Sequence, residues 1–255
     1  MILKSHSAAV ASVLVLGLFA STPAIALNYF DLSVYGYKTL KKGERLVENR
    51  TAYTYDGTDA SAPENNDDLL RSTFEFAYGI TDKTEVAAYL DFSHPDNGSW
   101  RHVEDRLRVR TSLFEKGQLP VDLGLYGEFE FPRHEDNNAE LELRGIIEKD
   151  IGKWKLLFNP KFSKVVSGID TGKPWQLGYA ASAIYELNDT WHPRLDLFGD
   201  FGPINNFDDK DKQVHLISPA VDIELDKGFS LGLGVAFGVT DNSESLIRTK
   251  LEWEF

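Results

Sequence analysis

Polar and apolar residues alternate along most of this chain, and the alternation is clearest in residues 245–255. From Ile247 to Phe255 the odd-numbered positions hold apolar residues or Thr, whereas the even-numbered positions hold Arg, Lys or Glu. Successive side chains of a β-strand point to opposite faces of the sheet. The segment is therefore predicted to be a strand with one apolar and one charged face.

The same period of two recurs upstream, in segments joined alternately by short turns and by longer, polar loops. We expect strands at residues 43–55, 69–80, 84–92, 106–113, 121–131, 139–151, 154–165, 175–187, 191–201, 214–225, 229–240 and 245–255. Pro160 and Pro219 lack an N–H group, so each should mark a bulge or a gap in its strand ladder. The pattern predicts an all-β fold, a single antiparallel up-and-down barrel of about twelve strands over residues 43–255.

The N-terminal part of the chain follows a different pattern. Residues 1–26 carry one charge, Lys4, then an apolar run and the small residues Ala24 and Ala26. This predicts a secretory signal peptide cleaved after Ala26, because the run is too short to span the ~30 Å of a bilayer core as a helix. A strand at residues 27–42 would make the strand count odd, so we expect this segment to be a periplasmic lead-in; a plug folded into the barrel is the alternative.

Composition narrows the class of protein further. The chain has 40 acidic and 27 basic side chains and a formal net charge of -13, which argues against a nucleic-acid partner because phosphate binding requires clustered Lys and Arg. There is no Cys, so disulfides, thiolate metal sites and cysteine nucleophiles are excluded. Downstream of the signal no apolar run has the length of a membrane-spanning helix, so strands closed into a barrel are the remaining way to cross a membrane.

Aromatic residues mark the ends of the apolar faces, which favours a membrane barrel over a lipocalin-like barrel or a β-sandwich of the same period. The expected aromatic girdle contains Trp154, Trp175, Tyr185, Trp191, Trp253 and Phe255. We therefore expect export to the bacterial outer membrane, with short turns in the periplasm and longer loops outside. The expected partners are membrane lipid, lipopolysaccharide, the barrel-assembly machinery acting on the C-terminal strand, and a small-molecule solute.

Charged residues occupy the opposite face, which is expected to line the lumen. The expected lumen-lining residues are Glu85, Asp91, Arg106, Arg108, Arg110, Asp122, Glu128, Glu130, Glu142, Arg144, Arg194, Asp196, Arg248 and Lys250. The three arginines at 106, 108 and 110 form a ladder that could select anions, but acids on the flanking strands favour cross-strand ion pairing. Gly178, Gly232 and Gly234 leave room for a narrow passage, for bulky side chains from across the barrel, or for a plug.

Five short motifs are the most distinctive part of the sequence. They read Y-G-I-T-D-K-T-E-V at 78–86, L-P-V-D-L-G-L-Y-G-E-F-E at 119–130, E-K-D-I-G-K-W-K-L at 148–156, L-G-Y-A-A-S at 177–182, and L-G-L-G-V-A-F-G-V-T-D followed by L-E-W-E-F at the end. Together they resemble a proteobacterial family labelled by its meta-pathway phenol-degradation member. The resemblance spans residues 43–255. It implies an outer-membrane barrel that helps small, often aromatic, molecules to cross, and it brings no catalytic motif.

Catalytic, cofactor and metal sites are not expected. The motif H-P-D-N-G at 94–98 resembles the H-x-S-N-G of outer-membrane phospholipase, but Asp96 replaces the serine nucleophile. The other histidines lack metal-site spacing, and the acidic loops 56–68 and 208–211 lack the glycine-centred spacing of a calcium loop. The predicted function is therefore a channel for passive or facilitated diffusion of small molecules. The alternatives are a closed structural or surface-interaction barrel and, less favoured, a lipid-modifying enzyme.

Overall fold

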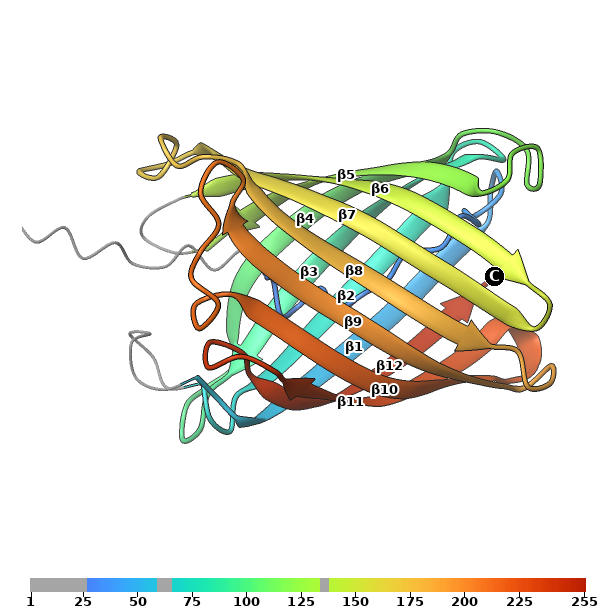
Figure 1. Cartoon of the computed structure of the whole chain (residues 1–255). Coiled ribbons are helices and arrows are strands. Elements are labelled where there is room, and N and C mark those ends of the chain that lie inside the picture. Colours follow the sequence, from blue (N-terminus) through green and yellow to red (C-terminus); the bar gives the residue numbers. More distant parts are fainter. Residues whose placement is uncertain (1–26, 59–65, 134–137) are drawn as a thin grey trace, which may run out of the picture.

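The computed structural model describes residues 27–58, 66–133 and 138–255, and this part of the chain forms one closed antiparallel barrel of twelve strands (Figure 1). The strands are β1 (Arg45–Asp56), β2 (Leu70–Gly79), β3 (Thr84–His94), β4 (Arg101–Ser112), β5 (Asp122–Pro132), β6 (Ala139–Ile151), β7 (Trp154–Ser167), β8 (Gln176–Tyr185), β9 (Trp191–Pro203), β10 (Val214–Glu224), β11 (Phe229–Gly238) and β12 (Ser245–Glu254). The predicted fold is confirmed. The expected signal peptide at 1–26 lies outside the described residues.

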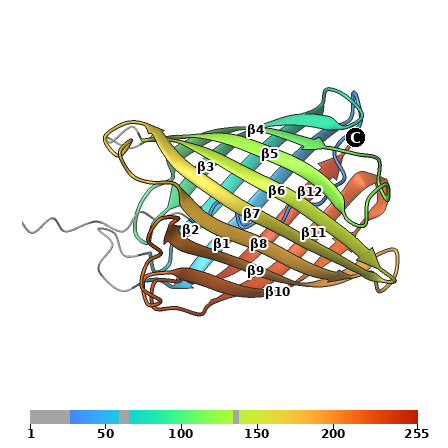
Figure 2. The same cartoon turned by 45° about the horizontal axis from the view of Figure 1, so that its top comes forward.

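The connections between strands alternate between the two ends of the barrel (Figures 1 and 2). The connections that follow β2, β4, β6, β8 and β10 lie at one end together with the C-terminus, and we call this the turn end. The remaining connections lie at the opposite end, which we call the loop end. A 3₁₀ turn, Asp226–Gly228, joins β10 to β11. No helix of the described residues is long and apolar enough to span a membrane.

Burial alternates along the strands, and the charged face is the buried one. In β4 the exposed fractions of Arg106 and Arg108 are 0% and 3%, whereas those of Leu107 and Val109 are 56% and 50%. Large apolar side chains are exposed in this way on strands all around the wall. Soluble monomers rarely expose a contiguous apolar surface beyond a few hundred Å². The wall is therefore suited to hydrocarbon on its outside and to charge on its inside.

The two prolines inside strands interrupt their ladders, as expected. The β6–β7 register skips a step opposite Pro160, and the β10–β11 register skips one opposite Pro219. A Cβ atom added to Gly145 would lie only 3.2 Å from Cγ of Pro160, so the glycine lets the proline ring lie close to the neighbouring strand. Both prolines thus remain in the wall because the missing N–H falls at a ladder gap.

The barrel closes where β1 meets β12, with Arg50 opposite Lys250. Phe255 extends this seam beyond the last strand, because its N–H donates to the Arg45 carbonyl and its carbonyl accepts from the Arg45 N–H, both at 2.9 Å. Its ring also stacks on Trp253, with centroids 4.3 Å apart. Phe255 therefore belongs both to the closing ladder and to an aromatic cluster at the turn end.

Deleting Phe255 should reduce the amount of assembled barrel, because it removes two seam hydrogen bonds and the ring that stacks on Trp253. The fraction of folded protein can be measured in outer membranes by comparing unheated and heated samples on semi-native gels. Leu225→Ala, which truncates an exposed apolar side chain at the same end, is the matched control. Wild-type amounts of heat-modifiable barrel in the Phe255 deletion would contradict this account of closure.

Candidate functional site

Residues 27–42 run through the lumen from the loop end to the turn end, and we call them the lumen segment (Figure 1). Near the loop end the Tyr29 hydroxyl accepts a hydrogen bond from the backbone N–H of Glu244 at 3.0 Å. Near the turn end the Leu40 N–H donates to Glu85 at 2.7 Å. The segment is not a strand of the wall, but the expected periplasmic position is not what the structure shows. An even number of strands excludes residues 27–42 from the wall, but it does not distinguish a position in the periplasm from one in the lumen.

One side of the lumen segment is apolar and packs against apolar residues of the wall, both small and large. The buried apolar cluster here contains Leu27, Tyr29, Leu32, Ala52, Ala180, Phe198, Val214, Leu216, Ala236 and Leu246. Ala180 on β8 and Ala236 on β11 share inner faces with Gly178, Gly232 and Gly234, whose small size leaves room for a passage, for bulky side chains or for a plug. The structure shows that near the loop end this space accommodates the lumen segment.

The other side of the segment is polar, and Asp31 is its centre. Asp31 is 4% exposed, and its Oδ1 accepts a hydrogen bond from Nη1 of Arg50 at 2.8 Å. Its second oxygen accepts from Arg144, and the Tyr35 hydroxyl donates to Oδ1 at 3.2 Å. Because Arg50 lies on β1 and Arg144 on β6, one carboxylate ties the lumen segment to two distant parts of the wall.

Tyr35 is held by its backbone and by its ring. Its N–H donates to Oδ1 of Asn159 at 2.7 Å, and its carbonyl accepts from Nδ2 of the same side chain at 3.0 Å. Its ring centroid lies 4.8 Å from that of Tyr126. The guanidinium groups of Arg108 and Arg144 lie 5.3 and 5.2 Å from the ring, within the range of cation–π attraction. The Asn159 side chain therefore makes the two hydrogen bonds with the Tyr35 backbone that a neighbouring strand would make in a sheet.

The arginine ladder of β4 is neutralised across the strands. Nε of Arg106 lies 2.7 Å from Asp91. Arg108 and Arg110 share Glu85, with nitrogen–oxygen distances of 2.6 and 2.9 Å. These contacts agree with the preferred interpretation of the ladder, which is cross-strand pairing.

A second ion-pair group joins β9, β10 and β12 on the opposite wall. Nε of Arg194 lies 2.8 Å from Asp196, and its Nη1 lies 2.7 Å from Asp222. Arg248 also donates to Asp196, and Lys250 pairs with Glu252 on its own strand at 3.3 Å. The two groups lie on opposite sides of the lumen segment.

The remaining expected lumen residues are also on the inner face. Glu128 accepts from Arg106 at 3.2 Å, and Glu142 accepts from Arg144. Asp122 and Glu130 instead have neutral donors, because Asp122 accepts from the Gly117 N–H at 2.6 Å and Glu130 accepts from the Asn28 amide at 3.3 Å.

The expected aromatic girdle divides between the two ends. Trp154, Trp191, Trp253 and Phe255 are exposed at the turn end, with exposed fractions between 39% and 48%. Tyr185 is half-buried there against Trp154, with ring centroids 4.9 Å apart. Trp175 is half-buried at the loop end, directly before β8.

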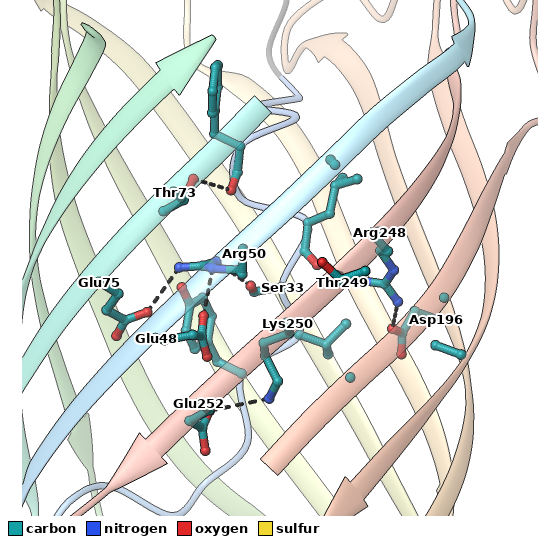
Figure 3. Close-up of a pocket in the computed structure, with 18 of the residues that line it drawn as sticks. Ser33, Glu48, Arg50, Thr73, Glu75, Asp196, Arg248, Thr249, Lys250 and Glu252 are labelled. Atoms are coloured by element: carbon teal, nitrogen blue, oxygen red, sulfur yellow. Dashed lines mark hydrogen bonds and ion pairs between the residues drawn. The ribbon is translucent and has the colours of Figure 1, made fainter. Parts of the chain in front are cut away.

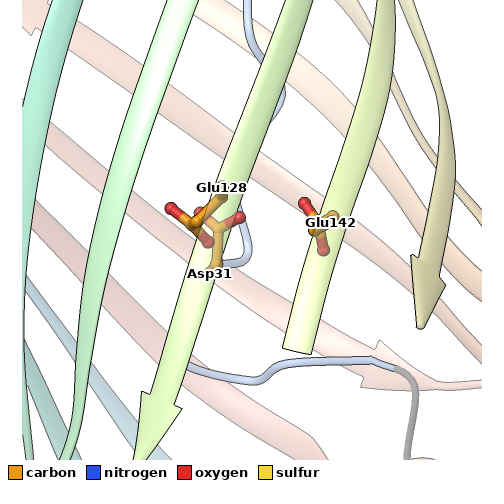
Figure 4. Close-up of side chains that lie close together, drawn as sticks. All are labelled: Asp31, Glu128 and Glu142. Carbon is orange, nitrogen blue, oxygen red and sulfur yellow. The ribbon is translucent and has the colours of Figure 1, made fainter. Parts of the chain in front are cut away.

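Asp31, Glu128 and Glu142 form a close group of carboxylates in the lumen (Figure 4). Ligand oxygens of the three lie within 4.8 Å of one another. Arg144 donates to two of the three residues, and Lys161 pairs with Glu142. Protein cations already neutralise this group, so it belongs to the ion-pair network of the lumen.

A second carboxylate group, Asp122, Glu148 and Asp150, lies near the turn end. Nζ of Lys116 lies 2.9 Å from Glu148 and 2.8 Å from Asp150. Burial disfavours the charged form of this lysine, but hydrogen bonds to Asp150 and Glu148 raise the pKa of its ammonium above the ordinary value. The lysine therefore supplies the positive charge at this group.

A buried ion pair near the loop end is absent from the expected site residues. Arg71 donates to both carboxylate oxygens of Glu244, at 2.7 and 2.8 Å, and Thr54 donates to the same carboxylate at 2.7 Å. Glu244 falls in a predicted loop. It has the same even-numbered, inward position as Arg248 and Lys250, but the apolar Leu246 between them interrupts the charged pattern and hides the signal.

A cavity of about 230 Å³ remains between the lumen segment and the wall, where residues of β1–β4 and β9–β12 line it (Figure 3). Figure 3 shows Arg50 between Glu48 and Glu75 on one side, and Arg248 against Asp196 on the other. Gly232 and Gly234 line it without side chains. At ~30 Å³ per water, the space suits several waters or one small organic molecule.

No protein-family model and no curated protein matches the sequence. Solved structures do share the fold. An outer membrane channel from Pseudomonas putida F1 has a TM-score of 0.61 and 12% identity, over 86% of this chain and 97% of that chain. The KdgM porin has a TM-score of 0.56 and 8% identity, over 82% and 99%. The NanC porin has a TM-score of 0.54 and 7% identity, over 82% and 98%.

The class of protein follows from the fold together with the wall. Closed antiparallel strands, an apolar exterior and a charged interior define a β-barrel of the outer-membrane type. At such low identity the similarity to solved structures shows the barrel fold alone. The resemblance to the phenol-degradation family stays a prediction.

Replacing Asp31 by Asn should lower the free energy of unfolding by about 3 kcal/mol, because it leaves two buried guanidinium groups without their shared counter-charge. Urea unfolding in detergent micelles, followed by tryptophan fluorescence, measures the change. Glu115→Gln is the control, since it breaks the solvent-exposed pair with Lys83 and should change nothing measurable. An Asp31→Asn effect as small as that of the control would show that Asp31 does not organise the lumen.

Proposed function

We propose that this protein is an outer-membrane channel through which small solutes cross passively, with the lumen segment limiting the size of the opening. The observation that carries the proposal is the cavity of about 230 Å³ inside a closed wall, lined by charged side chains and by Gly232 and Gly234. A barrel that served only as a rigid support would gain stability from filling this space with side chains.

The proposed location is the outer membrane, with the turn end in the periplasm and the loop end outside. The exposed apolar wall and the aromatic side chains of the girdle support it, because both match the hydrocarbon and interfacial zones of a bilayer. The acidic loops would then face lipopolysaccharide, whose divalent counter-ions suit such loops. The similar solved structures described as a channel and as porins support the same role.

A closed structural barrel is the second candidate, and the density of ion pairs favours it. Asp31 and Tyr35 hold the lumen segment by several contacts with the wall, and the ladder of β4 is paired throughout. The two candidates differ in whether ions pass the segment. The family resemblance adds that the solutes of a channel would be small and often aromatic.

Deleting residues 28–40 should raise the single-channel conductance severalfold in planar bilayers, because water replaces the lumen segment. The arginines released from Asp31 then face water, so the barrel should still assemble, and heat-modifiability on gels checks this. Wild-type protein should show a small, stable conductance. A folded wild-type barrel that passes no ions, beside a deletion variant that does, would favour the closed structural barrel.

The lumen segment can also be fixed in place by a disulfide, because the chain has no natural cysteine. The hydroxyl oxygens of Thr39 and Ser112 lie 3.2 Å apart, so the double variant T39C/S112C places two thiols at this contact. If the segment moves during conduction, oxidation should lower the conductance of the double variant and a reductant should restore it. The two single variants are controls that should not respond. Equal conductance in both redox states would show that the segment stays in place while solutes pass.

A further inference from the structure

Three arginines that line the cavity each have a buried hydrogen-bond donor without an acceptor among the described residues. Nε of Arg108, of Arg110 and of Arg248 each lacks a partner, and all three residues line the cavity. Arg108 is only 3% exposed. A buried donor that is left unpaired destabilises the folded protein, so an acceptor within reach of these arginines would stabilise it.

Among the described residues, Arg110 and Arg248 each have only a share of one carboxylate. Arg108 and Arg110 share Glu85 on one side of the cavity. Arg194 and Arg248 share Asp196 on the other side. Arg108 also pairs with Glu75 at 2.9 Å, and Arg194 also pairs with Asp222 at 2.7 Å. The divided carboxylates therefore leave Arg110 and Arg248 able to bind a further anionic partner.

Two of these arginines complete their contacts with backbone carbonyls of the lumen segment. Arg248 donates to the Leu32 carbonyl at 2.8 Å, and Arg110 donates to the Gly36 carbonyl at 3.5 Å. The second distance is at the limit of a hydrogen bond. A negatively charged oxygen would be a stronger acceptor for Arg110 than this carbonyl.

The rest of the lining is apolar enough for a hydrocarbon body. Apolar lining residues come from the lumen segment and from the wall, and they include Leu32, Val34, Leu46, Ala52 and Ala220. Binding sites for small molecules commonly combine such a surface with a few converging polar groups.

We infer that the cavity binds a small organic carboxylate with a compact apolar body, of the size of one aromatic ring. Its oxygens accept hydrogen bonds from Arg110 and Arg248, and its apolar part lies against the lumen segment. The inference rests on the proposed channel function of the same lumen and adds the chemical class of the solute.

The test measures binding rather than conduction, so its outcome does not depend on whether the channel passes ions. Benzoate and benzyl alcohol are compared as ligands of the folded wild-type barrel in detergent by saturation-transfer NMR and calorimetry. They share a ring and differ in charge. Benzoate should bind at least about tenfold more tightly, which corresponds to ~1.4 kcal/mol.

The variants Arg110→Gln and Arg248→Gln should each weaken benzoate binding about tenfold and leave benzyl alcohol unchanged. Arg101→Gln is the matched control, because Arg101 lies exposed on the same strand as Arg110. It should bind benzoate like the wild type. Heat-modifiability identifies any variant that fails to fold, and the wild-type comparison of the two ligands stands without variants.

Equal binding of benzoate and benzyl alcohol by the wild type would overturn the inference, and so would equal losses in all three variants. Preferential benzoate binding by a barrel that passes no ions in planar bilayers would sustain the carboxylate site and refute the proposed channel. Ion conduction without a preference for benzoate would support the proposed channel function and refute the carboxylate site.

Discussion

Pairing of buried charge is the constraint on which the interior of this barrel depends. A charge taken out of water is tolerated only beside a partner of opposite sign, and the wall brings many charged side chains into a narrow space. The lumen segment supplies some of the partners of opposite charge. Its Asp31 pairs with guanidinium groups on β1 and β6, and its backbone forms hydrogen bonds with the Asn159 side chain. The interior is therefore stabilised mainly by ion pairs and hydrogen bonds, with apolar packing confined to smaller clusters.

The wall could be predicted from the sequence because its signal is local. Each strand repeats with a period of two, and a slip of one residue would turn the charged face to lipid and the apolar face to the lumen. The periodicity therefore fixes which residues of a strand face inwards. The observed bounds of β6 match the expected range 139–151. The gaps at Pro160 and Pro219 were predictable because their cause is also local: the missing N–H removes a hydrogen bond from the ladder at the proline itself.

The contents of the lumen could not be predicted in this way, because their contacts are distant in sequence. Tyr35 is bonded to Asn159 and Tyr29 to Glu244, and no periodicity relates the members of such pairs. Strand parity excluded residues 27–42 from the wall but did not distinguish the periplasm from the lumen. Likewise, the glycines of β11 indicated space, whereas the position of the lumen segment decides how much of that space remains.

The path of the lumen segment restricts the order in which the protein folds. A Cβ atom on Gly79 would clash with the carbonyl oxygen of Lys41, so the lumen segment lies directly against β2 where it leaves the lumen. Its other end contacts Glu244, directly before the last strand. The seam joins the first strand to the last, so the sheet becomes a ring only after the whole chain has been made. The lumen segment must then lie along the concave side of the open sheet before the seam forms, since afterwards it would have to be threaded through a finished ring.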